Sequence, residues 1–166
     1  MYYSSNTAFS AYIKIGLSSL KAELAYRSVI FAVILLILIF RAPSDFLIIV
    51  GSVTSVAFLF GYVVPYVRRC RQLENIVSSV TVKNDTIIFG FSKIHFLNLS
   101  PRTEVQASVR MFDFKARRIE SLNKSFPVLK EIYEFKIGSQ KKYLARDFFD
   151  QFDAMKSALG TDRFVE

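Results

Sequence analysis

Residues 24-LAYRSVIFAVILLILIF-40 and 46-FLIIVGSVTSVAFLFGYVVPYV-67 are two long apolar runs, joined by the short segment 41-RAPSD-45. The second run holds 22 residues without a charge. At about 1.5 Å of rise per residue, a helix of that length crosses a hydrocarbon core roughly 30 Å thick. The first run is uncharged only over residues 28–40, so a full span must include Arg27, whose long side chain can reach the interface. The sequence therefore predicts a transmembrane helical hairpin over residues 24–67.

Positive charges flank the open ends of this predicted hairpin. Six cations lie there: Lys14, Lys21, Arg27, Arg68, Arg69 and Arg71. The connecting segment carries a single cation, Arg41, which Asp45 offsets. Because Lys and Arg are enriched in cytoplasmic flanks, this bias predicts that both termini are cytoplasmic. The three arginines after the second run, Arg68, Arg69 and Arg71, are candidate contacts for anionic lipid headgroups.

The net charge of +8 is unevenly distributed along the chain. Residues 1–71 hold seven Lys and Arg against two acidic residues, whereas residues 72–166 hold fifteen against twelve. Positive charge is thus concentrated beside the predicted hairpin, which favours anionic lipids over nucleic acid as its counter-charge. The single cysteine, Cys70, excludes an intrachain disulfide, and the first residues lack the basic and apolar regions of a cleavable signal peptide.

We divide the chain into an amphipathic N-terminal segment (residues 1–23), the hairpin (24–67) and a cytoplasmic domain (72–166). Within the first segment, Phe9, Ile13, Leu17 and Leu20 recur at steps of three and four, which favours a helix over residues 7–23. A strand is the alternative, because residues 12–15 are β-prone. Such a helix can lie in the headgroup plane or pack on the cytoplasmic domain.

The sequence period changes after Arg71. Runs rich in β-branched and aromatic residues predict short strands over residues 76–82, 86–91, 94–99, 105–114, 133–137 and 141–145. Turn residues at 83–85 and 138–140 join two pairs of these runs into hairpins. Gly90 marks a bulge or a point of close approach. Residues 117–126 are interpreted as a short strand followed by a loop.

The last predicted element is a helix that begins at Asp147 as N-cap and ends at Gly160. Its apolar stripe consists of Phe148, Phe152, Met155 and Leu159. We expect an α+β fold in which this helix closes one end of a small antiparallel sheet or partly open barrel.

This order of elements resembles the pleckstrin-homology-like (PH-like) domains of bacterial membrane proteins. The hairpin, the strands 133-YEFKI-137 and 141-KKYLA-145 and the final helix are similar to the YcxB-like family. The resemblance implies a bacterial inner-membrane protein with a PH-like domain and no established reaction. Two features of that family are absent: a tryptophan in a middle strand, and a proline before the final helix, where Ala145-Arg146 stands.

Few residues suggest catalysis. His95 is the only histidine and lies in a predicted strand with no catalytic partner nearby in sequence, so a structural role is expected. No pattern predicts a catalytic residue, a metal site or a cofactor. A second basic cluster, Lys115, Arg117 and Arg118, is either a solvated loop or a further candidate contact for lipid headgroups.

We therefore expect a protein that is not an enzyme, anchored in the lipid bilayer, that binds a partner or senses the membrane surface. The alternative is an accessory or assembly subunit of a membrane transporter or secretion complex. Gly51 and Ser55, four residues apart in the second run, form a small-residue pair that lets helices approach closely, within this hairpin or with a membrane-protein partner.

Overall fold

A computed structural model describes residues 1–41, 44–94, 101–122 and 128–165 of the chain. Contacts divide the chain into two compact units. One is Leu17–Cys70, and the other joins Met1–Gly16 to Arg71–Glu166. The segment that the sequence analysis separated as residues 1–23 is therefore shared between the two units.

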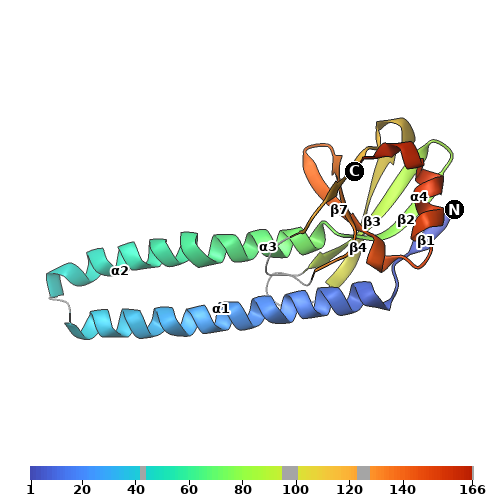
Figure 1. Ribbon diagram of the computed structural model, residues 1–166. Coiled ribbons are helices and arrows are strands. Elements are labelled where there is room, and N and C mark those ends of the chain that lie inside the picture. The colour runs from blue at the N-terminus through green and yellow to red at the C-terminus, as the bar shows by residue number, and fades with distance from the viewer. Residues whose placement is uncertain (42–43, 95–100, 123–127, 166) are drawn as a thin grey trace. The chain divides into compact units, whose positions relative to one another are not determined.

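The unit Leu17–Cys70 is helical, and its two arms lie side by side (Figure 1). Helix α1 spans Thr7–Arg41, so the predicted helix over residues 7–23 is confirmed and continues into the first apolar run. Helix α2 spans Ser44–Phe58 and passes through a π-helical turn, Leu59–Val63, into α3, Val64–Glu74. Two stretches, Thr7–Arg41 and Ile48–Glu74, are long and apolar enough to cross a membrane.

Large apolar side chains cover the outside of these helices. Phe40 and Ile48 are each 80% exposed, and Phe60 is 66% exposed. Between the arms, the ring of Phe31 stacks on Phe58 with 4.3 Å between centroids. The hairpin is thus held by contacts on its inner side while its outer side stays apolar and uncovered, as is typical of helices that face lipid.

The π-helical turn in the second arm has a cause in the sequence. Pro65 comes two residues after the end of the turn and lacks the N–H that an α-helix would bond to the carbonyl of Gly61. In an α-helix the proline ring would also clash with that carbonyl. Widening the turn by one residue separates the two groups, so the helix continues past the proline.

The other unit contains two four-stranded sheets with the orders β1-β2-β3-β4 and β7-β6-β5-β8. The strands are Tyr2–Ser4 (β1), Val77–Lys83 (β2), Thr86–Ile94 (β3), Pro101–Arg110 (β4), Ala116–Ile119 (β5), Ile132–Ile137 (β6), Gln140–Ala145 (β7) and Phe164–Val165 (β8). All neighbours pair antiparallel except β5 and β8, which are parallel. The predicted α+β class and both predicted hairpins are confirmed.

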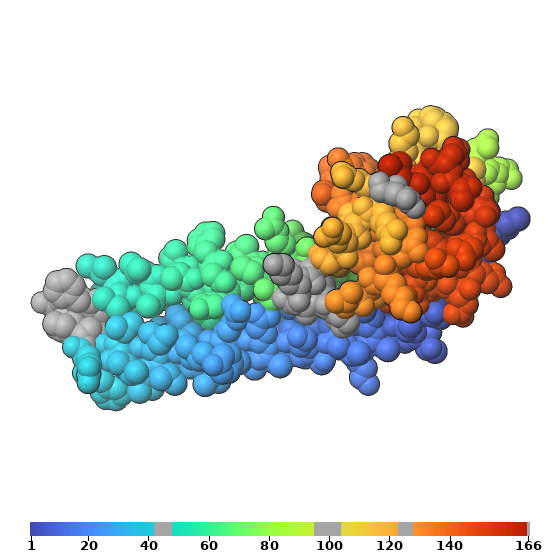
Figure 2. All heavy atoms as spheres, viewed as in Figure 1, coloured from blue at the N-terminus to red at the C-terminus, as the bar shows by residue number. Residues whose placement is uncertain are grey.

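Aromatic rings fill the space between the two sheets. Phe89 of β3 lies 4.6 Å from Phe135 of β6 and 5.6 Å from Phe114, measured between ring centroids. All three side chains are at most 2% exposed. These strands and α4, Phe152–Leu159, form one closely packed body in the space-filling view (Figure 2).

Gly90 is a point of close approach, as predicted. On β3 it pairs with Ser79 of β2 and Gln106 of β4, and the Ser79 hydroxyl donates a hydrogen bond across it to the side chain of Glu104. A Cβ added at Gly90 would collide with the side chains of Ser79 and Glu104. The register of β2 also shifts between Val77 and Ser79, opposite this glycine, so a bulge accompanies the close approach.

The final helix starts later than predicted, because residues 146–148 form a separate 3₁₀ turn. The Asp147 carboxylate accepts the Lys130 N–H at 2.8 Å and therefore does not cap α4. The prediction that Asp147 is the N-cap is wrong. The apolar stripe of α4 is buried as expected, and Gly160, with φ of +92°, ends the helix.

Several strand boundaries also differ from the sequence analysis. The run predicted over residues 105–114 leaves the extended conformation at Arg110, because Met111–Asp113 form a 3₁₀ turn. Strands β1 and β8 were not predicted. The strand predicted over residues 94–99 begins at Ile94, the last residue of β3, and its other residues lie outside the described part of the chain.

The first residues of the chain belong to the β unit. Strand β1 pairs with β2, and the Met1 ammonium donates to the Val82 carbonyl at 2.8 Å. At the start of α1, the rings of Phe9 and Tyr12 lie 5.4 and 5.1 Å from Phe148 in edge-on contacts. Of the two placements considered for this segment, its first turns adopt the one packed on the domain.

Candidate functional site

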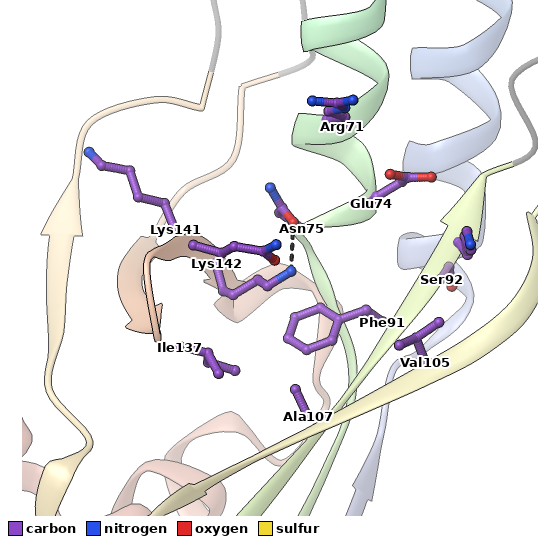
Figure 3. Close-up of a pocket in the computed structure, with 12 residues that line it drawn as sticks. Arg71, Glu74, Asn75, Phe91, Ser92, Val105, Ala107, Ile137, Lys141 and Lys142 are labelled. Carbon is purple, nitrogen blue, oxygen red and sulfur yellow. Dashed lines mark hydrogen bonds between the residues drawn. The ribbon is translucent and has the colours of Figure 1, made fainter.

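An open groove lies in the β unit where the last turn of α3 meets strands β3, β4 and the β6–β7 hairpin (Figure 3). Its volume is about 820 Å³, within the range of small-ligand sites. The end of α3 contributes Arg71 and Glu74, β3 contributes Lys93, and β7 contributes Lys141 and Lys142. The groove thus collects charged side chains from segments far apart in the sequence.

Apolar side chains form the rest of the groove wall. Phe91 of β3 pairs across the sheet with Val105 of β4, and both line the cavity together with Ile137 of β6. Val105 is 47% exposed although its strand neighbours place it on the core side of the sheet. Ile137 lies four residues along β6 from Tyr133, which stacks on Phe152 of α4. Helix α4 therefore covers one end of β6 and leaves the other end open.

Lys142 occupies an unusual position on its strand. In the register of the sheet it pairs with Phe135, which pairs with Ala116 on the other side. Paired residues share a face, so Lys142 lies on the same face as two fully buried core residues. An ammonium group is therefore placed at the edge of the hydrophobic core.

Asn75 holds this lysine in place from the end of α3. Its backbone carbonyl accepts the Tyr143 N–H at 2.9 Å, which ties β7 to the helix end. Its side-chain Oδ1 accepts a hydrogen bond from Lys142 Nζ at 2.7 Å. The same ammonium lies 4.5 Å from the centre of the Phe91 ring, and Figure 3 shows the lysine extended between these two residues.

The surroundings of Lys142 offset only part of the cost of burying its positive charge. Burial lowers the pKa of its ammonium below the ordinary lysine value, and the nearby Glu74 carboxylate opposes this shift. Glu74 itself accepts the Ile94 N–H at 2.9 Å, which holds it at the edge of β3. Among the described residues no carboxylate lies within 4.0 Å of Lys142 Nζ, and a neutral amide is its hydrogen-bond partner.

The groove as a whole is positive. Four cations, Arg71, Lys93, Lys141 and Lys142, face one carboxylate, that of Glu74. Lys141 is neutralised by Glu134 at 2.9 Å. In the described part of the chain, Arg71 and Lys93 form no salt bridge. The arrangement suits an anionic group with an apolar part, because the cations are grouped beside exposed hydrocarbon.

The three arginines predicted at the end of the second span separate in the structure. Arg71 lines the groove. Arg68 is exposed on α3, whereas Arg69 forms a salt bridge with Glu23, which also pairs with Arg27 on α1. Arg69 therefore serves to join the two arms of the hairpin.

The second predicted cluster lies outside the groove. Lys115 precedes β5, and Arg117 and Arg118 lie on it; all three are exposed. Arg117 pairs across the sheet with Glu134, on the face opposite to Phe135. Arg118 borders a separate hollow, where Arg146 bridges Glu131 and Asp153. The structure does not bring this cluster together with Arg71.

Sequence reasoning missed Lys93, Lys141 and Lys142 as groove residues. The sequence did contain a sign of Lys142: successive residues of a strand face opposite sides, and Lys142 therefore faces the same side as Leu144, which is buried. A charged residue at such a position is uncommon and points to a site. Lys93 and Lys141 carry no such signal, since exposed lysines at strand ends are ordinary.

His95 lies outside the described residues, so its predicted structural role stays a prediction. Among the residues that the structure describes, no group of three or more His, Cys, Asp and Glu side chains could hold a metal ion. Cys70, at the end of the helical unit, is buried.

Comparison with models of protein families, with curated proteins and with solved structures finds no match to this chain.

Proposed function

We propose that this protein is anchored by two membrane spans and that its β domain binds a ligand or partner at the membrane surface without catalysing a reaction. The observation that carries the proposal is the apolar outer surface of the helical hairpin, where Phe40 and Ile48 are each 80% exposed. Such a surface is unfavourable in water and favourable in a hydrocarbon core. The domain is then tethered beside the lipid headgroups.

The proposed orientation places both termini in the cytoplasm, in the inner membrane of a bacterium. The distribution of cations supports it, because six of them flank the open ends of the hairpin and only Arg41 lies near its connection. Arg68, exposed at the end of the second span, and Arg71 are the proposed headgroup contacts of this flank, and Arg69 contributes to the local positive charge.

We also propose that the β domain is PH-like and related to the YcxB-like family. Two four-stranded sheets that enclose an aromatic core, with a terminal helix stacked on Tyr133, support this assignment. The groove supports a binding role, since it combines four cations with apolar side chains, and its one carboxylate, Glu74, accepts a hydrogen bond from the backbone of β3.

Membrane insertion and orientation can be tested in one experiment on the full chain. In a Cys70→Ser background, Ser44→Cys places a single thiol at the hairpin connection, and Ser157→Cys places one at an exposed position of α4. We expect the protein to stay in the membrane after alkaline extraction. An impermeant thiol reagent should label position 44, and not position 157, from outside the cytoplasm. Release by alkali would refute the membrane assignment, and the opposite labelling pattern would refute the orientation.

A second candidate function is an accessory or assembly subunit of a transporter or secretion complex. One observation favours it: a Cβ added at Gly51 would meet no atom within 4 Å. Gly51 lines a hollow between the two arms together with Leu35, Leu38 and Ile39 of α1, so α1 does not fill the space beside it, and a side chain of another helix could occupy that space. Gly51→Leu should abolish copurification with a membrane partner under this reading and leave the first proposal unaffected.

A further inference from the structure

We propose that the groove is a binding site for the phosphate group of an anionic phospholipid, with Lys142, Arg71 and Lys93 as its cationic contacts. This inference rests on the proposed function, because a lipid ligand requires a domain that lies beside a bilayer. A general attraction of positive charge to the membrane would involve any exposed cation, whereas this site requires Lys142, Arg71 and Lys93.

The first argument is that the ammonium group of Lys142 is partly buried and keeps an unused hydrogen-bond donor. Its ammonium has three N–H groups, and the hydrogen bond to Asn75 at 2.7 Å uses one of them. The Phe91 ring covers another side of the group at 4.5 Å. A donor remains for a ligand, and partial burial strengthens an interaction between this ammonium and an incoming anion.

The second argument is the pairing of charge with hydrocarbon. Arg71 and Lys93 have no salt-bridge partner in the described chain, and the same groove holds Val105, which is 47% exposed, and the half-buried Ile137. A phosphate flanked by glycerol and acyl carbons satisfies both kinds of surface. Inorganic phosphate would satisfy the cations alone.

The third argument is the position of Arg71 on its helix. It follows Val67, the last apolar residue of the predicted span, by four residues on α3. A helix rises about 1.5 Å per residue, so the two lie roughly 6 Å apart along its axis. Arg71 is therefore at headgroup depth for any span that ends near Val67, and a lipid phosphate is the anion most available to it.

The chain offers a direct optical test, because it contains no tryptophan. Val105→Trp introduces one indole into the groove at a half-exposed position. The full-length variant is reconstituted in nanodiscs of phosphatidylcholine with increasing phosphatidylglycerol. We expect a saturable change in tryptophan emission with phosphatidylglycerol, and a much weaker response when inorganic phosphate is added to discs of phosphatidylcholine alone.

Three further substitutions in the Val105→Trp background test the residues. Lys142→Met should weaken the apparent affinity for phosphatidylglycerol by about tenfold, the effect of losing one charged hydrogen bond. Glu74→Gln keeps the acceptor for the Ile94 N–H and removes the one carboxylate of the groove, so it should strengthen binding. Lys136→Met is the matched control, since Lys136 is exposed on the opposite face of β6 from Ile137 and should leave binding unchanged.

Three results would overturn the proposal. The first is an emission that does not respond to phosphatidylglycerol. The second is an equal response to inorganic phosphate, which would make the site one for free phosphate. The third is an equal loss in Lys142→Met and Lys136→Met, which would mean non-specific attraction to the membrane. In each case alkaline extraction still reports separately on the membrane anchor, so failure of the site and failure of the proposed function remain distinct.

Discussion

Replacing Phe148 by alanine should both destabilise the β unit and release the first turns of α1 from it. Phe148 is 1% exposed and lies in the 3₁₀ turn before α4. Its ring meets Phe9 at 5.4 Å and Tyr12 at 5.1 Å, both in edge-on geometry. One side chain therefore joins the two ends of the chain, which are more than a hundred residues apart.

The expected magnitude follows from these contacts. Truncation of a buried phenylalanine to alanine lowers the free energy of unfolding by about 3–5 kcal/mol. Edge-on aromatic pairs contribute about 0.5–1.5 kcal/mol each beyond their buried area, so the contacts with Phe9 and Tyr12 account for roughly 1–3 kcal/mol of the loss. For a small domain, a loss of 3 kcal/mol corresponds to a fall in Tm of about 12 °C or more.

Thermal unfolding of the full chain in detergent, followed by near-ultraviolet circular dichroism, measures the Tm. Hydrogen exchange then shows whether amides of residues 7–13 lose protection. Phe112→Ala is the matched control, because Phe112 is 63% exposed and its removal should change the Tm little. A double-mutant cycle between Phe9→Ala and Phe148→Ala should give a coupling energy of about 0.5–1.5 kcal/mol.

Two outcomes would contradict this account. If Phe148→Ala lowers the Tm no more than Phe112→Ala, the ring does not carry the packing assigned to it. If the effects of Phe9→Ala and Phe148→Ala simply add, the N-terminal segment is not held through this contact.

Three other substitutions have expected outcomes of their own. Gly90→Ala should destabilise the domain by about 1 kcal/mol in chemical denaturation, because the new methyl group displaces the ends of the Ser79 and Glu104 side chains and breaks the hydrogen bond between them, whereas Gly51→Ala, where a Cβ meets nothing within 4 Å, should not destabilise the chain. Lys142→Met removes an ammonium whose pKa is lowered by burial, and such a group destabilises the folded state at every pH below its folded pKa. The stability of the wild type relative to the variant should therefore rise as the pH approaches 10.5. A series of unfolding midpoints at increasing pH measures this difference, and a difference that does not change with pH would refute the account. Reversal of the second basic cluster (Lys115, Arg117 and Arg118 to Glu) should weaken, at low salt, the affinity of the nanodisc-embedded Val105→Trp chain for phosphatidylglycerol if this exposed face also touches lipid, and an unchanged affinity would leave the groove as the better account.

Elements with a strong local signal were predictable from the sequence. The hairpin of apolar helices follows from uninterrupted hydrophobic runs, and the β6–β7 hairpin from alternation around Gly138, whose φ is +59°. Strand β1 has only three residues and exists because β2 offers it an edge, so no local pattern marks it. The early start predicted for α4 failed for a related reason: Asp147 is a good cap by type, but Lys130 engages it.

The site was less predictable than the fold. Arg71 was identified because it follows a span, and that reason is local. The groove depends on the meeting of α3, β3 and β7, which no spacing in the sequence reveals. The sequence also grouped Arg69 with Arg71 because they are near neighbours, yet on a helix their side chains diverge and Glu23 of the other arm engages Arg69.

Lys142 is a charged residue at a strand position that faces the hydrophobic core. The lysine lies on the same face as Phe135 and Leu144, which are buried, and Gln140 at the turn is the other polar residue on this face of β6 and β7. Departures of this kind are expected where function, and not folding, selects the residue. The two readings of Lys142 therefore predict opposite signs. If it serves packing, Lys142→Met lowers the stability at neutral pH and leaves the lipid response intact. If it serves an anion, the same substitution relieves the penalty of burial in the free protein and weakens the apparent affinity for phosphatidylglycerol by about tenfold.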